Sequence, residues 1–254
     1  MILSKAKVHS ANLEKEISSK INAGKLNELL LIVPTNRKIR SLRREIISSA
    51  PNNAVGKINL ETIGSFAINL LSPGESASSR VLSDASSTVL LKQCFREVSL
   101  KYFSNYEKDF PFGTLQRIKN VIAEYKRRGV SPGLLLREAE NLNGSEKFKA
   151  EDIAAVFELY NSKCIQLGVK EIGDVYREII SIASGNFDKQ FRTLYPDVDI
   201  IIVNGFDEFT RPEIEIINSS ADVKNISLFI SFDYFSGNSA IFSHLDSCYN
   251  KFVD

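Results

Sequence analysis

The stretch IIIVNGFDEF, residues 200–209, decides how the fold of this chain is predicted. Its four consecutive β-branched apolar residues are typical of a strand buried on both faces of a parallel sheet. The strand stops at Asn204-Gly205, a pair that also favours a two-residue hairpin turn. A returning strand should then follow, but TRPEIEII (210–217) follows instead, and its T-x-x-E start has the spacing of a helix capping box. We therefore predict strand, short loop and helix here, in preference to a hairpin.

The sequence on either side continues this alternation of strands and helices. Short apolar runs predict strands in LLLIV (29–33), KINLETI (57–63) and ISLFI (226–230). Amphipathic spacing predicts helices at 12–23, 36–49 and 211–220. Such alternation implies a parallel sheet with crossover helices. Asn204 is then expected at the carboxyl tip of a parallel strand, where α/β folds hold their ligands.

The middle of the chain has a different pattern. A connection rich in Ser, Gly and Pro at 72–87 precedes about a hundred residues in which only helices are predicted. The predicted helices are roughly 85–104, 112–128, 132–140, 147–168 and 172–184. The strand pattern returns near residue 198. We predict an α/β domain from 1–79 and 190–254, interrupted by an all-helical insertion at 80–189.

Composition excludes several classes of protein. The formal net charge is +1, so any nucleic-acid binding must come from local patches. Three cysteines lie 70 and 84 residues apart, which is no metal or redox spacing, and a sparse, odd count fits a reducing cytoplasm. No window resembles a signal peptide or a membrane span. We expect a cytoplasmic protein without a membrane partner, a metal site or a cofactor.

The position of Asn204 is where a motor ATPase carries its Asp-Glu pair, the Asp on magnesium and the Glu beside the attacking water. Asn204 is neutral, a poor substitute for a carboxylate on a hard cation, and Gly205 has no side chain. No G-x-x-x-x-G-K-[ST] phosphate loop occurs, and KVHSANLEKEI (7–17), after the first candidate strand, contains no glycine. We predict a degenerate Walker B position at Asn204 and Gly205, and no catalytic residues.

Four phrases resemble, in order and spacing, the N-terminal part of the AddB/RexB family, the B subunits of bacterial helicase–nuclease complexes that process double-strand DNA breaks. They are LLLIVPTNRKIRSLRREI, INLETIGSFAINLL, FPFGTLQRIKNVIAEYKRRGVSPGLL and DIIIVNGFDEFTRPEIEII, and the resemblance covers roughly 28–232. It implies a RecA-like, superfamily 1 helicase-like sheet with a helical insertion. It also implies a domain that is frequently a degenerate motor, and a helicase motor subunit of the AddAB/RexAB type as partner.

Two departures from the family limit what the resemblance implies. The family subunit is far longer, and its later helicase-like domain and nuclease have no counterpart here, so the chain is expected to be an N-terminal fragment. YPDVDIII (195–202) has Ile201 where a nuclease motif needs lysine. Some family members keep a phosphate loop and an Asp at the position of Asn204. This chain has neither, so ATP binding is not carried over and no activity of the fragment is expected.

The segment NRKIRSLRR (36–44) is the candidate DNA contact. Arg37 and Lys38 fall in a first helical turn, where cations oppose the helix dipole and a bound phosphate would relieve the repulsion. In helicase-like folds this helix follows the motif that touches single-stranded DNA. The predicted DNA-binding residues, making backbone contacts to a single strand, are Asn36, Arg37, Lys38, Arg40 and Arg44. An acidic patch of a partner and plain solvent are the alternatives for this basic face.

Two further segments allow functional and structural interpretations. The cations of EYKRRG (124–129) suit the C-terminal end of a helix that stops at Gly129. YFSNYEKDFPFG (102–113) carries five aromatic residues, which favour the core of the insertion over stacking on bases, although stacking stays possible. The predicted function is a non-catalytic domain that binds or channels DNA and docks the motor subunit in double-strand break repair. The alternative is an interaction scaffold without DNA contact.

Overall fold

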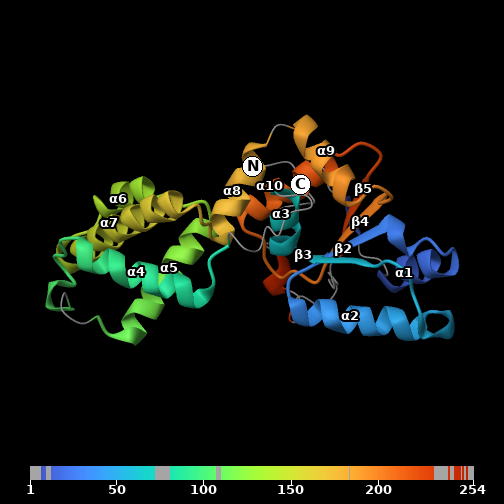
Figure 1. Ribbon diagram of the computed structural model, residues 1–254, viewed down its shortest axis with the longest axis horizontal. Helices are drawn as coiled ribbons and strands as arrows, with labels where there is room; N and C mark the ends of the chain where they lie inside the picture. The colour runs from blue at the N-terminus through green and yellow to red at the C-terminus, as the bar shows by residue number, and fades with distance from the viewer. Residues whose placement is uncertain are drawn as a thin grey trace. The chain divides into compact units, whose positions relative to one another are not determined.

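The computed structural model describes residues 7–9, 13–71, 81–106, 110–182, 184–231, 240, 243–246, 248 and 250. Its contacts divide the chain into two compact units, 1–75 with 178–254 and 76–177 (Figure 1). We name them the sheet unit and the helical unit. The domain limits expected from the sequence, 80 and 189, stay a prediction.

Within the described residues, the sheet unit is built on five parallel strands. They are β1 (Lys7–His9), β2 (Leu29–Val33), β3 (Asn59–Thr62), β4 (Ile200–Asn204) and β5 (Ser227–Ser231), in the order β1-β5-β4-β2-β3. The predicted α/β class is therefore confirmed. Both neighbours of β4 run parallel to it, and a helix follows its loop, so the strand–loop–helix prediction for 200–217 is confirmed over the hairpin.

Helices cover both faces of this sheet, with α2 on one side and α3, α9 and α10 on the other (Figure 1). The bounds are α1 (Leu13–Asn22), α2 (Asn36–Ser49), α3 (Ile63–Leu71), α9 (Ser184–Leu194) and α10 (Arg211–Ala221), with 3-10 turns η1 (Leu26–Glu28), η2 (Pro51–Asn53) and η5 (Ser243–Leu245). All five residues of β2 are buried, as the uninterrupted apolar run predicts. Alternate residues of β2 pack against Ile39, Leu42 and Ile46 of α2.

The helix α9 was not among the helices predicted from the sequence. It presents Phe187 and Phe191 to the interior, and Phe191 lies 6.2 Å, edge to face, from Phe66 of α3. Tyr195 follows the helix, with its ring centroid 6.0 Å from that of Phe66. Burying three aromatic side chains stabilises this corner by several kcal/mol, about 2 kcal/mol for each. This tertiary packing fixes a short helix whose sequence gives a weak local signal.

The helical unit contains α4 (Asp84–Glu97), η4 (Ser104–Tyr106), α5 (Phe112–Arg127), α6 (Pro132–Ala139), α7 (Gly144–Leu167) and the first part of α8 (Ile172–Ser181). Ser83 and Ser131 cap α4 and α6 by accepting the amides of Ser86 and Leu134. Gly129 follows α5 at φ 74°, a left-handed conformation that suits a helix end. The predicted helix 85–104 is too long, because the chain leaves the helix at Glu97 to bury Leu100 and Phe103.

The two connections that bound the helical unit run side by side. Val81 and Lys170 form a parallel bridge, and the Leu82 amide donates to the Lys170 carbonyl at 2.9 Å. Just beyond, α8 begins against α5 so closely that a Cβ placed on Gly173 would lie 2.4 Å from the backbone carbon of Lys126. Only a residue without a side chain fits there. Within the described residues, no helix has the length and apolar character to cross a membrane.

Candidate functional site

The order of the strands places a topological switch point at the carboxyl ends of β2 and β4, the position at which α/β sheets form a crevice, and we use that name for it. From β2 the chain proceeds outward to β3, whereas from β4 it proceeds in the opposite direction to β5. The two strands are hydrogen-bonded neighbours, so the connections that leave them diverge. Parallel α/β sheets bind ligands at such a switch point. The predicted site residues after β2 and at the end of β4 therefore come together, although about 170 residues separate them in the chain.

Pro34 and Gly205 form the two sides of this crevice. Ile32 pairs with Val203, so the residues that follow stay level. An ideal Cβ on Gly205 would lie 3.9 Å from Pro34 Cδ, an ordinary contact distance, so space alone does not require glycine. Gly205 has φ 79°, a left-handed conformation in which a Cβ would be strained. Glycine thus lets the chain leave β4 sharply beside Pro34.

The N-terminus of α2 opens at the same edge. Thr35 is the N-cap, as predicted, and its hydroxyl accepts the Lys38 amide at 3.2 Å. The Ile39 amide donates to the Thr35 carbonyl at 3.1 Å. The amides of Asn36 and Arg37 have no acceptor among the described residues, as is usual for a first helical turn. Two N–H groups at the positive end of the dipole are left for an anion.

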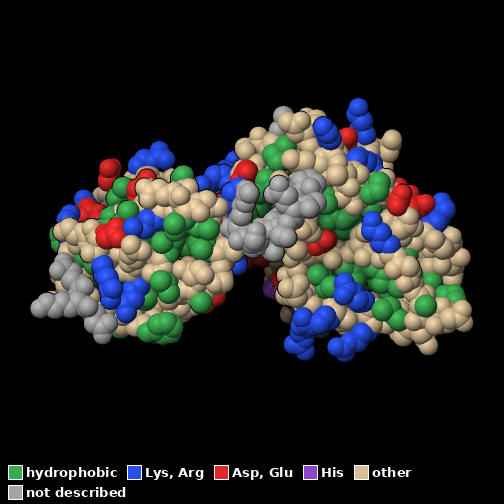
Figure 2. All heavy atoms as spheres, viewed as in Figure 1, with side chains coloured by type: hydrophobic (Ala, Val, Ile, Leu, Met, Phe, Trp, Pro, Cys, Tyr) green, Lys and Arg blue, Asp and Glu red, His purple; other side chains and the backbone are tan. Residues whose placement is uncertain are grey.

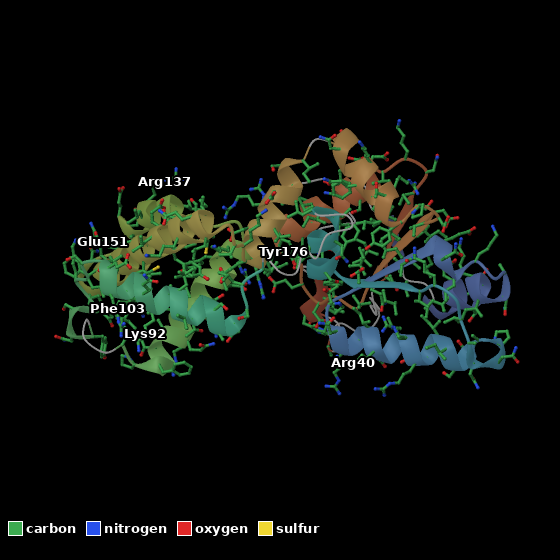
Figure 3. All side chains as sticks on the ribbon, in the orientation of Figure 1. Arg40, Lys92, Phe103, Arg137, Glu151 and Tyr176 are labelled. Carbon is green, nitrogen blue, oxygen red and sulfur yellow. The ribbon has the colours of Figure 1, made fainter. Side chains whose placement is uncertain are left out.

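The cations of α2 fall into two groups. All of Asn36, Arg37, Lys38, Arg40, Arg43 and Arg44 are exposed, and Figure 2 shows Lys and Arg gathered over this helix. No acidic side chain of the described residues forms an ion pair with any of them, and Glu45, on the same helix, instead accepts from Ser41 at 2.8 Å. Asn36, Arg37 and Lys38 belong to the first turn. Arg40 points away from the sheet, opposite the buried stripe (Figure 3).

Asn204 is the last residue of β4, at the switch point. Asn204 is 5% exposed. It lies two residues after Ile202 on the same strand, and the side chain of Ile202 packs in one hydrophobic cluster with α2. Its side chain therefore lies on the α2 face of the sheet. Ser231, 7% exposed, pairs with it on β5, so buried polar residues end both strands.

A second polar group, not found from the sequence, lies on the opposite face at the end of β3. The Glu61 carboxylate accepts from Ser65 at 2.5 Å, from Asn69 at 3.1 Å and from Tyr195 at 3.2 Å. Burial, reinforced by the Glu61 charge, raises the pKa of Tyr195. The Tyr195 phenol therefore stays protonated and donates to Glu61. The network joins β3, α3 and the residue after α9, which is a structural role.

The acids near β4 do not form a metal site. Asp207 and Glu208 are exposed in the loop, and Glu213 accepts from the Thr210 amide at 2.8 Å and hydroxyl at 2.9 Å, so it caps α10. Among the described residues no group of three or more His, Cys, Asp or Glu side chains could hold a metal ion.

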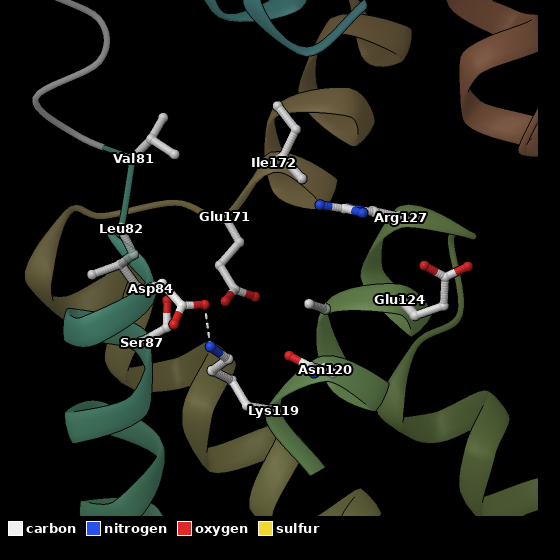
Figure 4. Close-up of a pocket in the computed structure, with 11 residues that line it drawn as sticks. Val81, Leu82, Asp84, Ser87, Lys119, Asn120, Glu124, Arg127, Glu171 and Ile172 are labelled. Carbon is white, nitrogen blue, oxygen red and sulfur yellow. Dashed lines mark hydrogen bonds and ion pairs between the residues drawn. The ribbon is translucent and has the colours of Figure 1, made fainter. Parts of the chain in front are cut away.

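The helical unit has a pocket of its own, of about 430 Å³, which the sequence did not indicate (Figure 4). Lys119, 5% exposed, pairs with Asp84 there, and Glu171 projects its carboxylate toward them. The ammonium of Lys126 lies 3.5 Å from the same Glu171 and 2.8 Å from Asp174, and Lys126 is 1% exposed. The sequence placed Lys126 among the cations at a helix end, but its ammonium is buried between α5 and α8. These charges are largely paired with one another, which favours a structural role.

Fold and site together define a parallel α/β protein with a basic, polar crevice at its switch point and an inserted helical unit. A comparison with known protein families matches residues 5–253 to the family described as ADDB, N-terminal, and the chain belongs to this family. Membership connects it with DNA repair and implies a complex with an AddA-type partner and DNA. No curated protein matches the chain.

Proposed function

We propose that this chain is a non-catalytic, RecA-like helicase domain that holds the backbone of a single DNA strand at the crevice between β2 and β4. In the AddB-type subunit it would guide that strand while docking the motor subunit. Asn204 stands where an ATPase needs a carboxylate, which supports a domain that handles DNA without hydrolysing ATP.

The observation that carries the proposal is the convergence of unsatisfied donors at one edge of the sheet. The Asn36 and Arg37 amides and the Arg37 and Lys38 side chains have no acceptor among the described residues, and the buried side chain of Asn204 lies at the end of the neighbouring strand β4. All are groups that donate hydrogen bonds to phosphate oxygens. A phosphodiester at this position would satisfy the amides and relieve the charge repulsion in the first turn of α2.

One observation favours a second candidate, a scaffold without DNA contact. Arg40 and Arg44 are exposed and four residues apart, so they share one side of α2, and Arg40 points away from the sheet (Figure 3). A convex basic face of this kind would also suit an acidic patch on the motor subunit. The two candidates differ in which cations matter for DNA.

The test is single-stranded DNA binding measured by fluorescence anisotropy over a range of salt concentrations. With two phosphate contacts on a single strand, the logarithm of the binding constant should fall with the logarithm of the salt concentration with a slope of about −1.4. Arg37→Ala/Lys38→Ala should weaken binding and flatten that slope, and Arg40→Ala/Arg44→Ala should do the same if the strand continues along α2. Thermal unfolding should be nearly unchanged, since these side chains are exposed.

The matched control is Lys189→Ala/Lys224→Ala, which removes two exposed cations elsewhere in the sheet unit. It should leave the slope as in the parent. If both α2 variants bind DNA like the parent at every salt concentration, the crevice does not hold the strand. If these α2 variants also no longer bound the motor subunit, the second candidate, a scaffold without DNA contact, would be established.

A further inference from the structure

The aromatic segment 102–113 is divided between the core and the surface. Phe103 and Phe110 are buried, 4% and 6% exposed, and pack with their centroids 5.5 Å apart. The expectation that these aromatics build the core is thus met by two of the five. Tyr102 is 42% exposed, and Phe148, from the first turns of α7, is 45% exposed. Single exposed aromatic side chains are common on protein surfaces, so the neighbours of these two rings decide what they can bind.

A buried carboxylate holds the loop that presents Tyr102. Asp152 of α7 is 3% exposed and accepts the amides of Lys101 at 3.0 Å, Tyr102 at 2.8 Å and Phe103 at 3.0 Å. Three consecutive amides on one carboxylate fix the backbone, because hydrogen bonds to a charged group are the strong ones. Tyr102 is therefore presented by a rigid segment, although it lies between helices. Rigid presentation lowers the entropy cost of binding.

Each exposed ring has an ammonium beside it. Lys101 Nζ lies 5.5 Å from the centroid of Phe148, and Lys149 Nζ lies 5.9 Å from that of Tyr102. Lys101 also donates to Glu151 at 2.8 Å, which occupies one of its three protons and leaves two. We call Lys101, Tyr102, Phe148 and Lys149 the stacking surface.

We propose that the stacking surface binds bases of single-stranded nucleic acid, with Tyr102 and Phe148 as platforms and the two lysines on the adjoining phosphates. This inference rests on the proposed function and adds a base-contacting site on the helical unit to the backbone site on the sheet unit. A nucleotide presents a π-face and an anion a few ångströms apart, and each ring–ammonium pair offers the complements of both. The contact would be indifferent to base sequence.

A protein partner is the competing occupant. Exposed aromatics also occur in protein interfaces, but there charged residues are depleted from the core of the patch. Here each ring has a lysine ammonium 5.5 or 5.9 Å from its centroid. The charge arrangement favours a polyanion with planar groups over an apolar protein surface.

The experiment compares two probes on the full chain, an oligothymidylate and a backbone of equal length without bases. The parent should bind the oligothymidylate more tightly, because stacking contributes only when bases are present. Tyr102→Ala/Phe148→Ala should weaken oligothymidylate binding about tenfold or more and abolish the difference between the probes. The Asp152 clamp acts on backbone amides, so the variant should unfold at nearly the parent temperature.

Failure of this inference is distinguishable from failure of the proposed function. Arg37→Ala/Lys38→Ala should weaken both probes alike, because it removes phosphate contacts only. If that variant weakens binding and Tyr102→Ala/Phe148→Ala does not, the backbone site stands and the stacking surface is refuted. If Tyr102→Ala/Phe148→Ala instead binds DNA like the parent but no longer binds the motor subunit, the stacking surface contacts a protein partner and the inference is overturned.

A charge variant provides a test with the opposite sign. Glu151→Gln removes the anion that shares Lys101 and should tighten oligothymidylate binding by about twofold, since Lys101 then offers its whole charge. Glu158→Gln removes an equal charge from an exposed position farther along α7 and should change binding less. If the two variants changed oligothymidylate binding equally, the overall charge of the protein would explain the effect, and a local contact at Lys101 would be contradicted.

Discussion

Pro34 and Gly205 lie level with each other at the ends of two hydrogen-bonded parallel strands, and a Cβ on Gly205 would meet Pro34 Cδ at 3.9 Å. The two residues start connections that leave the sheet in opposite directions. Both strands stop at the same height, so the switch point lies between these two residues. What glycine contributes there is its backbone conformation, and the space beside Pro34 is large enough for a methyl group.

We expect Gly205→Ala to destabilise the chain by about 1–2 kcal/mol, because φ 79° is unfavourable for a residue with a Cβ. Gly205→Asn should cost less, since asparagine tolerates left-handed backbone. Urea unfolding of the three proteins checks the order. An alanine variant as stable as the parent would show that the loop relaxes to another conformation without cost.

Gly173→Ala should be more damaging than an ordinary surface change, because its Cβ would lie 2.4 Å from the Lys126 carbon and 2.7 Å from the Lys126 oxygen. Backbone atoms cannot rotate away, so α8 must shift from α5, at a cost of about 1–3 kcal/mol. Gly133→Ala in α6 is the matched control. Nothing lies within 4 Å of the added methyl group, and the change should stabilise by about 0.5–1 kcal/mol. Chemical denaturation should show opposite signs for the two variants.

Asp152→Asn should destabilise the helical unit by about 2 kcal/mol or more, because an amide would turn one N–H₂ toward backbone donors that now meet a carboxylate. Glu151→Gln, one residue earlier and more exposed, should change stability much less, because its ion pair with Lys101 is screened by solvent. Hydrogen exchange at Lys101, Tyr102 and Phe103 would localise the effect. Unchanged protection of these amides in Asp152→Asn would contradict the clamp.

The pH dependence of stability should reveal the ion pair between Lys20 and Glu28, whose Nζ–Oε2 distance is 2.7 Å. The hydrogen bond from Lys20 holds the pKa of Glu28 below its ordinary 4.5, so this stabilisation is present above 4.5 and is lost as pH falls through the folded value. Burial lowers the pKa of Lys20, but its bonds with Glu28 and Asp199 outweigh that and raise it above 10.5. The stabilisation from this ion pair is therefore also lost as pH rises through the folded pKa of Lys20, which lies above 10.5.

Lys20→Met should accordingly lower the melting temperature at pH 7, and the difference from the parent should narrow as pH falls below 4.5. Lys189→Met, an exposed change in α9, serves as the control and should follow the parent at every pH. A difference that stays constant down to pH 2 would mean that lost packing of the Lys20 stem, and not the ion pair, causes the destabilisation.

Local patterns were sufficient for the elements that form the crevice. β2 and α2 have the predicted bounds, because an uninterrupted apolar run and a capped amphipathic segment are signals within one stretch of chain. α10 begins where the T-x-x-E spacing indicates. The roles of the α2 cations and of Asn204 stay predictions, since they depend on a ligand that the fold alone does not supply.

What the sequence missed depends on pairs that are distant in the chain. Lys126 meets Asp174 across 48 residues, and the 101–103 amides meet Asp152 across about 50. Neither Lys126 nor Asp152 differs locally from a solvated charge in a helix. The early end of α4 has the same origin, because a carboxylate on α7 takes the backbone amides that a longer helix would have used.

The bridge between Val81 and Lys170 has a consequence for the order in which the chain folds. The sheet unit must bring together segments on either side of 76–177, and closing a flexible loop of that length carries a large entropy cost. Once the helical unit has formed, the bridge reduces the open loop to about a dozen residues, which lowers the cost by about 2 kcal/mol. The inserted helices, whose contacts lie within 76–177, would then act as a nucleus that brings the strands of the sheet together.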